Sequence, residues 1–80
     1  ETSGCRYAIE VKPSTSPDDD ITRGIFQCVK YKAILEAMRK VEYGRYAIST
    51  LLVFAGSMSD RNKQLAEVLE IKFVEHLKIK

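Results

Sequence analysis

The stretch RYAISTLLVF, residues 45–54, decides the fold. It is mostly apolar, it is rich in β-branched and aromatic side chains, and Ala55 and Gly56 follow it as a break. A short run of this kind, without polar alternation, is typical of a central strand that is covered on both faces. It therefore predicts a sheet, and the segments before and after it supply the neighbouring elements.

A second strand is predicted upstream at residues 6–12, RYAIEVK, and Pro13 ends it. Successive side chains of a strand point to opposite faces. One face therefore carries three large apolar side chains, those of Tyr7, Ile9 and Val11. The other face carries Ala8, Glu10 and Lys12.

Residues 19–42 predict a long helix between these strands, with Gly44 as its stop signal. The acidic residues 18–20 favour a helix start, and a set of metal ligands is the alternative interpretation. One sector of this helix is expected to face the sheet, and its members are Gly24, Gln27, Tyr31, Ile34, Leu35 and Met38. Gly24 would allow a close approach, and the amide of Gln27 would need a partner there.

Downstream, residues 57–60 have the form of a capping box and open a second helix, with Leu65, Val68 and Leu69 on one face. Residues 71–79 favour a strand, because four of their five odd positions are apolar. The order is therefore β-α-β-α-β, an α/β fold with a mixed or parallel sheet flanked by helices. Residues 1–80 are expected to form a single domain.

The composition is that of a globular chain, with 45% hydrophobic and 30% charged residues and a net charge of +2. No apolar run approaches the roughly 20 residues of a membrane span. Two cysteines, Cys5 and Cys28, give neither a disulfide framework nor metal spacing, which favours an intracellular, cytoplasmic location. Charge is uneven: residues 1–20 hold two bases and five acids, whereas residues 21–45 hold six bases and two acids. That pattern can orient a polyanion, or be a solvated helix face.

One pair of residues carries a chemical interpretation. Glu10 and Lys12 stand two apart on one strand face, where a carboxylate can bind a divalent cation and an ammonium can stabilise charge on a phosphate. A surface ion pair is the alternative. His76 has no acid–base partner in the pattern, and the four glycines form no phosphate-binding loop.

Glu10-x-Lys12 on a strand, followed by Gln27-x-x-x-Tyr31 on a helix, resembles the restriction-endonuclease-like superfamily, the PD-(D/E)XK nucleases, over residues 6–55. The resemblance implies the C-terminal part of that core and a metal-dependent deoxyribonuclease. Glu10 and the carbonyl of Val11 would bind Mg²⁺ or Mn²⁺, and Lys12 would be the catalytic lysine. Gln27 and Tyr31 would brace the site or contact the nucleic acid.

The family also uses an acidic ligand on the preceding strand, and only Glu1 precedes Glu10 among the acids here. We therefore expect residues 1–80 to be a fragment of a larger nuclease-like domain, inactive by itself. From charge alone, Arg23, Lys30 and Lys32 are further phosphate contacts to DNA.

The alternatives are a non-catalytic α/β module that binds DNA or protein, and a structural subdomain. No membrane partner is expected. A homodimer through an open sheet edge or swapped elements is expected from the incomplete core.

Overall fold

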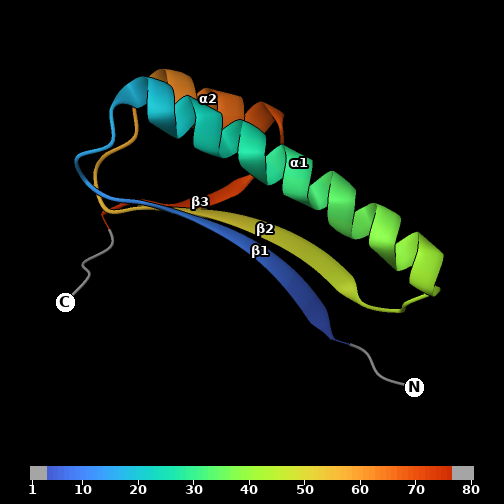
Figure 1. The fold of residues 1–80 in the computed structure, drawn as a ribbon. Coiled ribbons are helices and arrows are strands. Elements are labelled where there is room, and N and C mark those ends of the chain that lie inside the picture. The colour runs from blue at the N-terminus through green and yellow to red at the C-terminus, as the bar shows by residue number, and fades with distance from the viewer. Residues whose placement is uncertain (1–3, 77–80) are drawn as a thin grey trace.

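The computed structural model describes residues 4–76, and it confirms the α/β fold with the order β-α-β-α-β. The elements are β1 (Cys5–Lys12), α1 (Asp18–Glu42), β2 (Ala47–Phe54), α2 (Asp60–Val68) and β3 (Lys72–Val74). The three strands form one parallel sheet in the order β1-β2-β3, as Figure 1 shows. β2 is central, as its apolar sequence predicts.

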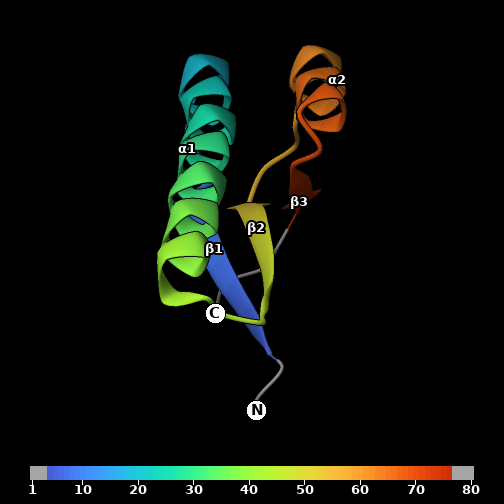
Figure 2. The same ribbon diagram turned by 90° about the vertical axis from the view of Figure 1, so that its right-hand side faces the viewer.

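Both helices cover the same face of this sheet (Figures 1 and 2). Each crossover leads to the next strand in the same direction, and crossovers of one hand then place their helices on one side. No described helix covers the other face of β2, so the predicted two-sided cover is wrong as to helices, although Val53 on that face is only 9% exposed. The side chains of Tyr7, Ile9 and Val11 lie on the uncovered face and are 63%, 54% and 55% exposed.

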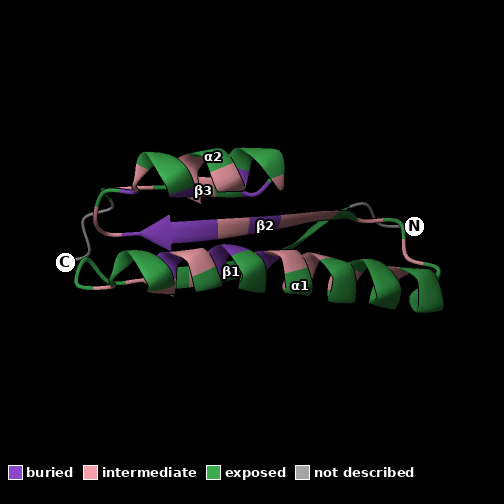
Figure 3. Ribbon diagram, turned by 90° about the horizontal axis from the view of Figure 1, so that it is seen from above, coloured by how far each residue is buried: buried purple, intermediate pink, exposed green. Residues whose placement is uncertain are grey.

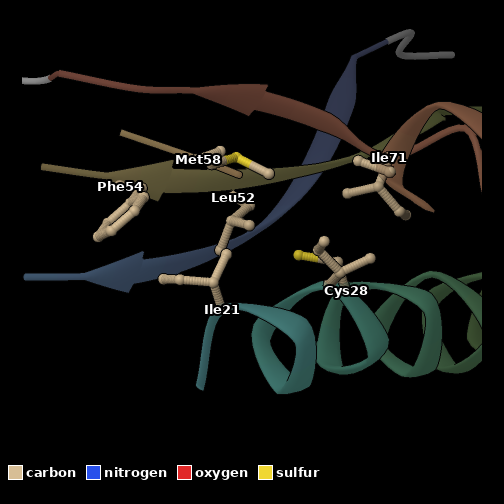
Figure 4. Packing of buried hydrophobic residues seen from close by; sticks show 8 residues of the cluster. Ile21, Cys28, Leu52, Phe54, Met58 and Ile71 are labelled. Atoms are coloured by element: carbon tan, nitrogen blue, oxygen red, sulfur yellow. The ribbon is translucent and has the colours of Figure 1, made fainter. Parts of the chain in front are cut away.

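The core lies between the sheet and the two helices (Figure 4). Leu52 of β2 is fully buried there, and its burial contributes about 2 kcal/mol. The buried cluster consists of Ile21, Ile25, Cys28, Leu52, Phe54, Met58, Ala66 and Ile71. Because this cluster draws on β2 and both helices, it fixes α1 over the sheet.

α1 buries a different face from the one predicted. Its buried residues are Ile21, Gly24, Ile25 and Cys28, with the i, i+3, i+4, i+7 spacing of a core-facing stripe. Gln27 is exposed, so its predicted position against the sheet is wrong. The 25 residues of α1 span about 37 Å, whereas the eight residues of β1 span about 26 Å. The C-terminal half of α1 therefore extends beyond the buried core and is mostly exposed, as Figure 3 shows.

The helix ends at Glu42, as the sequence predicts, but the left-handed residue that stops it is Tyr43 and not Gly44. Tyr43 takes the left-handed conformation at φ 53°. The N–H of Gly44 donates to the carbonyl of Arg39 at 3.0 Å, and that of Tyr43 to Lys40 at 3.3 Å, which is a Schellman motif. Gly44 has another role, since a Cβ there would lie 2.8 Å from Cδ2 of the Tyr46 ring.

α2 begins at Asp60, two residues later than a capping box with Ser57 as N-cap would start it, and the Ser59 hydroxyl accepts from the N–H of Asn62 at 3.2 Å. Asn62 and Ala66 are its buried residues, whereas Val68 is 75% exposed, so the predicted inner face is wrong at Val68. β3 has three residues, so the predicted strand is wrong at residues 71, 75 and 76, and its positions 77–79 lie outside the described residues. Between residues 4 and 76, neither helix combines the length and apolarity that a membrane crossing needs.

Candidate functional site

Glu10 and Lys12 lie near the C-terminal end of β1, on the face that α1 covers. Their register partners on β2 are Leu52 and Phe54. Gly24 of α1 lies directly above them: a Cβ at Gly24 would be 3.1 Å from Cε of Lys12 and 3.7 Å from Cγ of Glu10. The helix therefore approaches the pair this closely only because residue 24 has no side chain, as the sequence predicts.

Lys12 is held between two carboxylates. Its Nζ lies 3.6 Å from Oε2 of Glu10 and 3.2 Å from Oδ1 of Asp20. All three side chains are partly buried, with exposed fractions of 16% for Lys12, 22% for Glu10 and 27% for Asp20. Partial exclusion of water strengthens these attractions relative to a solvated pair. We call Glu10, Lys12, Asp20 and Tyr31 the Lys12 cluster.

Tyr31 completes the cluster from the next turns of α1. Its hydroxyl donates to Oε1 of Glu10 over 3.4 Å. The negative charge of Glu10 raises the pKa of Tyr31, so the phenol stays protonated and remains a donor at neutral pH. Tyr31 thus orients the Glu10 carboxylate from the side opposite Lys12.

The pKa values of two further groups, Asp20 in the cluster and Cys28 beside it, are also shifted. A hydrogen bond from Lys12 lowers the pKa of Asp20, which is therefore a carboxylate at neutral pH. Burial and then the charge of Glu10 raise the pKa of Cys28 to about 11. The Cys28 thiol is consequently neutral and is not a nucleophile.

Sequence reasoning missed the contact of Asp20 with Lys12. The predicted helix start is confirmed, because Asp18, Asp19 and Asp20 occupy the first turn of α1. However, the short turn at residues 13–17 returns this helix start to the end of β1, which brings Asp20 onto Lys12. The signal was available, because a helix that follows a strand through a short loop begins beside that strand's C-terminal end.

The predicted phosphate contacts do not form one patch. Arg23 borders the Lys12 cluster, with Nη2 3.5 Å from Oδ1 of Asp20. Lys30 is exposed on the outer side of α1. Lys32 lies about 180° round the helix from Arg23 and lines a small hollow with residues of β2 and β3. Gln27, the predicted partner of Tyr31, is exposed beside the cluster.

Asn62 is a buried polar residue that the sequence did not single out. Its amide nitrogen donates to Oδ1 of Asp18 at 2.9 Å, and its amide oxygen accepts from the Thr22 hydroxyl at 2.8 Å. Hydrogen bonds from the Ser59 hydroxyl, and then from Arg61, lower the pKa of Asp18. These contacts fasten α2 to the first turn of α1, and so they support the helix that carries Asp20 and Gly24.

The donor set for a metal ion is small. In the described part of the chain, no three His, Cys, Asp or Glu side chains converge on one point. A closed protein cage is therefore not built from residues 4–76. Mg²⁺, however, takes one or two carboxylates from a protein and completes its shell with water and phosphate oxygens. Glu10 and Asp20 are the carboxylates of the cluster, and both contact the ammonium of Lys12.

Searches of protein-family models, curated proteins and solved structures found no match to this chain. Any statement about its function therefore rests on the geometry of the Lys12 cluster.

Proposed function

We propose that the Lys12 cluster belongs to the site of a metal-dependent deoxyribonuclease of the restriction-endonuclease-like class. The observation that carries the proposal is the contact between Tyr31 and Glu10. These residues are 21 positions apart, yet the phenol of the helix lies on the carboxylate of the strand, 3.4 Å away. The two halves of the sequence resemblance thus come from adjacent elements and share one cluster.

Lys12 would supply the positive charge of this site. Hydrolysis requires a water oxygen to bond to phosphorus while the bond from phosphorus to the leaving sugar oxygen breaks, and negative charge builds on the phosphate oxygens. A partly buried ammonium stabilises that charge more than a solvated one does. Lys12 would then exchange its anionic partner, and its ammonium would contact the phosphate in place of the Asp20 carboxylate.

Glu10 would be the principal acidic ligand of Mg²⁺ or Mn²⁺, together with the carbonyl of Val11. Such an ion, when bound, offsets negative charge on a phosphate. Tyr31 would hold Glu10 in place through its hydroxyl, and Arg23 would meet the DNA backbone beside the cluster. An intracellular location belongs to the proposal, because Cys5 and Cys28 are both free thiols.

Because residues 1–80 are expected to be inactive by themselves, the test is nicking of supercoiled plasmid DNA by the intact parent protein, with Mg²⁺, with Mn²⁺ and with EDTA. We expect metal-dependent nicking by the wild-type protein and a loss of about 100-fold or more in Lys12→Ala, because one charge-stabilising group is removed. Glu10→Gln should be similarly impaired. Lys40→Ala, on the exposed end of α1, is the matched control and should retain activity. Metal-dependent nicking that survives both Lys12→Ala and Glu10→Gln would contradict the proposal, as would its absence in the wild-type protein.

A second candidate is a non-catalytic module that binds DNA or protein. It is favoured by the position of Lys12, which two carboxylates already neutralise, and by the small donor set among residues 4–76. This candidate predicts DNA binding that weakens steeply with salt and does not respond to Mg²⁺. A filter-binding titration at several salt concentrations, run beside the nicking assay, separates the two functions.

A further inference from the structure

The outer edge of β1 is an open hydrogen-bonding edge. Within residues 4–76, β1 pairs with β2 on one side, and no strand lies on the other. The carbonyls of Gly4 and Lys12 accept from β2 and the residue after it, so the even-numbered residues of β1 direct their main-chain groups inwards. The odd-numbered residues from Cys5 to Val11 therefore direct N–H and C=O groups outwards.

The backbone of β1 does not block this edge. The strand is eight residues long, its register with β2 is continuous, and it contains neither proline nor a bulge. Natural proteins usually block such edges, because they pair with other chains. The sequence of the edge then decides which chain fits.

We propose that β1 pairs with β1 of a second copy of this chain, antiparallel about a two-fold axis at Ala8. Ala8 would lie opposite the partner's Ala8, and Arg6 opposite the partner's Glu10. In this register the outward groups of Tyr7 would exchange both hydrogen bonds with the partner's Ile9. The register makes Arg6 and the partner's Glu10 a non-hydrogen-bonded pair, in which facing side chains lie closest.

Charge selects this register over its neighbours. A shift by two residues in one direction places Arg6 opposite the partner's Ala8, which removes the ion pair. A shift in the other direction places Arg6 opposite the partner's Lys12, and like charges facing each other are destabilising. Shifts by one residue would turn the helix-covered face of one copy to the bare face of the other. The strand is thus self-complementary about Ala8.

The helices are compatible with this pairing. Gly24 approaches both Lys12 of β1 and Leu52 of β2, so α1 lies over the space between these strands. With strands about 4.8 Å apart, the two α1 helices of the dimer would lie about 10 Å apart, which is a normal packing distance.

Two exposed apolar residues of α1 lie on the side that would be covered. Ile34 and Met38 are 46% and 42% exposed. Both lie within about 60° of Tyr31 round the helix, on the side away from Cys28 and hence above the open edge of β1. Pairing would bury them between the two helices. It would also place the partner's Arg6 beside Glu10, so that each Lys12 cluster gains a guanidinium from the second copy.

The first test is sedimentation of charge-reversal variants, and it is independent of any nuclease activity. We expect a wild-type dimer of twice the 9.1 kDa chain mass. Arg6→Glu and Glu10→Arg should each shift it to monomer, and the double variant should restore the dimer. Glu42→Gln is the control, because Arg6 also lies 3.6 Å from Glu42 of its own chain. A wild-type monomer, or a dimer that both single reversals leave intact, would overturn the proposal.

The second test is disulfide trapping in a Cys5→Ser background. Ala8→Cys should give a covalent dimer on mild oxidation, because residues facing each other across a two-fold axis lie within disulfide reach. Val11→Cys is the matched control, since the register separates it from the partner's Val11 by about 20 Å. Absence of the cross-link at position 8, or equal trapping at position 11, would refute the register.

Discussion

The absence of a side chain at Gly24 allows α1 to lie close to β1. Ala is a better helix former than Gly by about 1 kcal/mol, but a Cβ at position 24 would lie 3.1 Å from Lys12 and 3.2 Å from Leu52. Leu52 is fully buried, so a shift of its side chain would disturb the core around it. We therefore expect Gly24→Ala to lower the free energy of unfolding by about 1 kcal/mol, as an overpacked site does. Urea denaturation measures this change.

The control for Gly24→Ala is Ala37→Gly, an exposed position on the same helix. At this position only helix propensity changes, so the free energy of unfolding of Ala37→Gly should be about 1 kcal/mol lower than that of the wild type. If Gly24→Ala raises the stability instead, α1 does not approach β1 as closely as the structure shows.

The stability of the folded state depends on pH through Asp20. Lys12 lowers the pKa of Asp20 below the ordinary value of 3.8, so its carboxylate stabilises the folded state above that value. This contribution is lost as the pH falls through the lowered pKa, because the unfolded state then binds the proton more readily. We expect Asp20→Asn to be less stable than wild type at pH 7, with a difference that shrinks towards pH 2.

Denaturation midpoints between pH 7 and pH 2 check the Asp20 prediction. Asp19→Asn is the matched control, since the Asp19 side chain is 87% exposed and lies 3.9 Å from its nearest cation, Arg61. Its substitution should change the midpoint little. A difference for Asp20→Asn that stays constant over this pH range would contradict the ion pair with Lys12.

At the scale of the element, the end of α1 contains a residue poorly suited to its conformation. Tyr43 is left-handed and 91% exposed, so its ring contributes little packing to offset the backbone cost of about 1 kcal/mol or more. We expect Tyr43→Gly to raise the free energy of unfolding by about 1 kcal/mol, measured by thermal and urea denaturation. Gly44→Ala should do the opposite, because the Tyr46 ring occupies the place of a Cβ.

The extents of β1, α1 and β2 could be predicted from the sequence, because they depend on local signals, whereas β3 is shorter than predicted at its described end. Pro13 ends β1, Gly56 follows β2, and the helix bounds lie close to those expected. The buried face of α1 could not be predicted, because it depends on how much of the helix the sheet covers. Only the N-terminal half of α1 contacts the core, so Ile21 and Ile25 determine which face of the helix is buried. Ile34 and Met38 lie beyond the core, and their apolar side chains made the sequence pattern favour another face.

One part of the candidate site could also be predicted from the sequence, and another part could not. Glu10, Lys12 and the approach of Gly24 follow from alternation along one strand and one helix pattern. The contact of Asp20 with Lys12 depends on the path of the loop between them, which the composition of residues 13–17 does not specify. The exposure of Gln27 follows from the same rotation of α1.

The whole molecule is a thin plate. Its extents are 41 × 28 × 15 Å and its radius of gyration is 13.8 Å. A compact chain of this length has a radius of gyration of about 11.6 Å. The difference follows from one layer of helices on one face of the sheet. The opposite face carries Tyr7, Ile9 and Val11 without a cover in the described part of the chain.

This one-sided core predicts unequal costs for equal truncations. Ile25→Ala removes a fully buried side chain and should cost about 3 kcal/mol. Ile9→Ala removes a side chain that is 54% exposed and should cost about 1 kcal/mol or less. Urea titrations of both variants give the comparison. Equal costs would show that another part of the protein covers the bare face in solution.

The parallel sheet also determines how the chain would bear a pulling force. β1 begins at one end of the sheet and β3 ends at the other (Figure 1). Tension between these two ends would run along the strands and load the hydrogen bonds of each ladder together in shear. β2 is joined to β1 by eight register pairs and to β3 by three. The plate is therefore expected to give way first between β2 and β3, as two successive force peaks in a single-molecule extension trace would reveal.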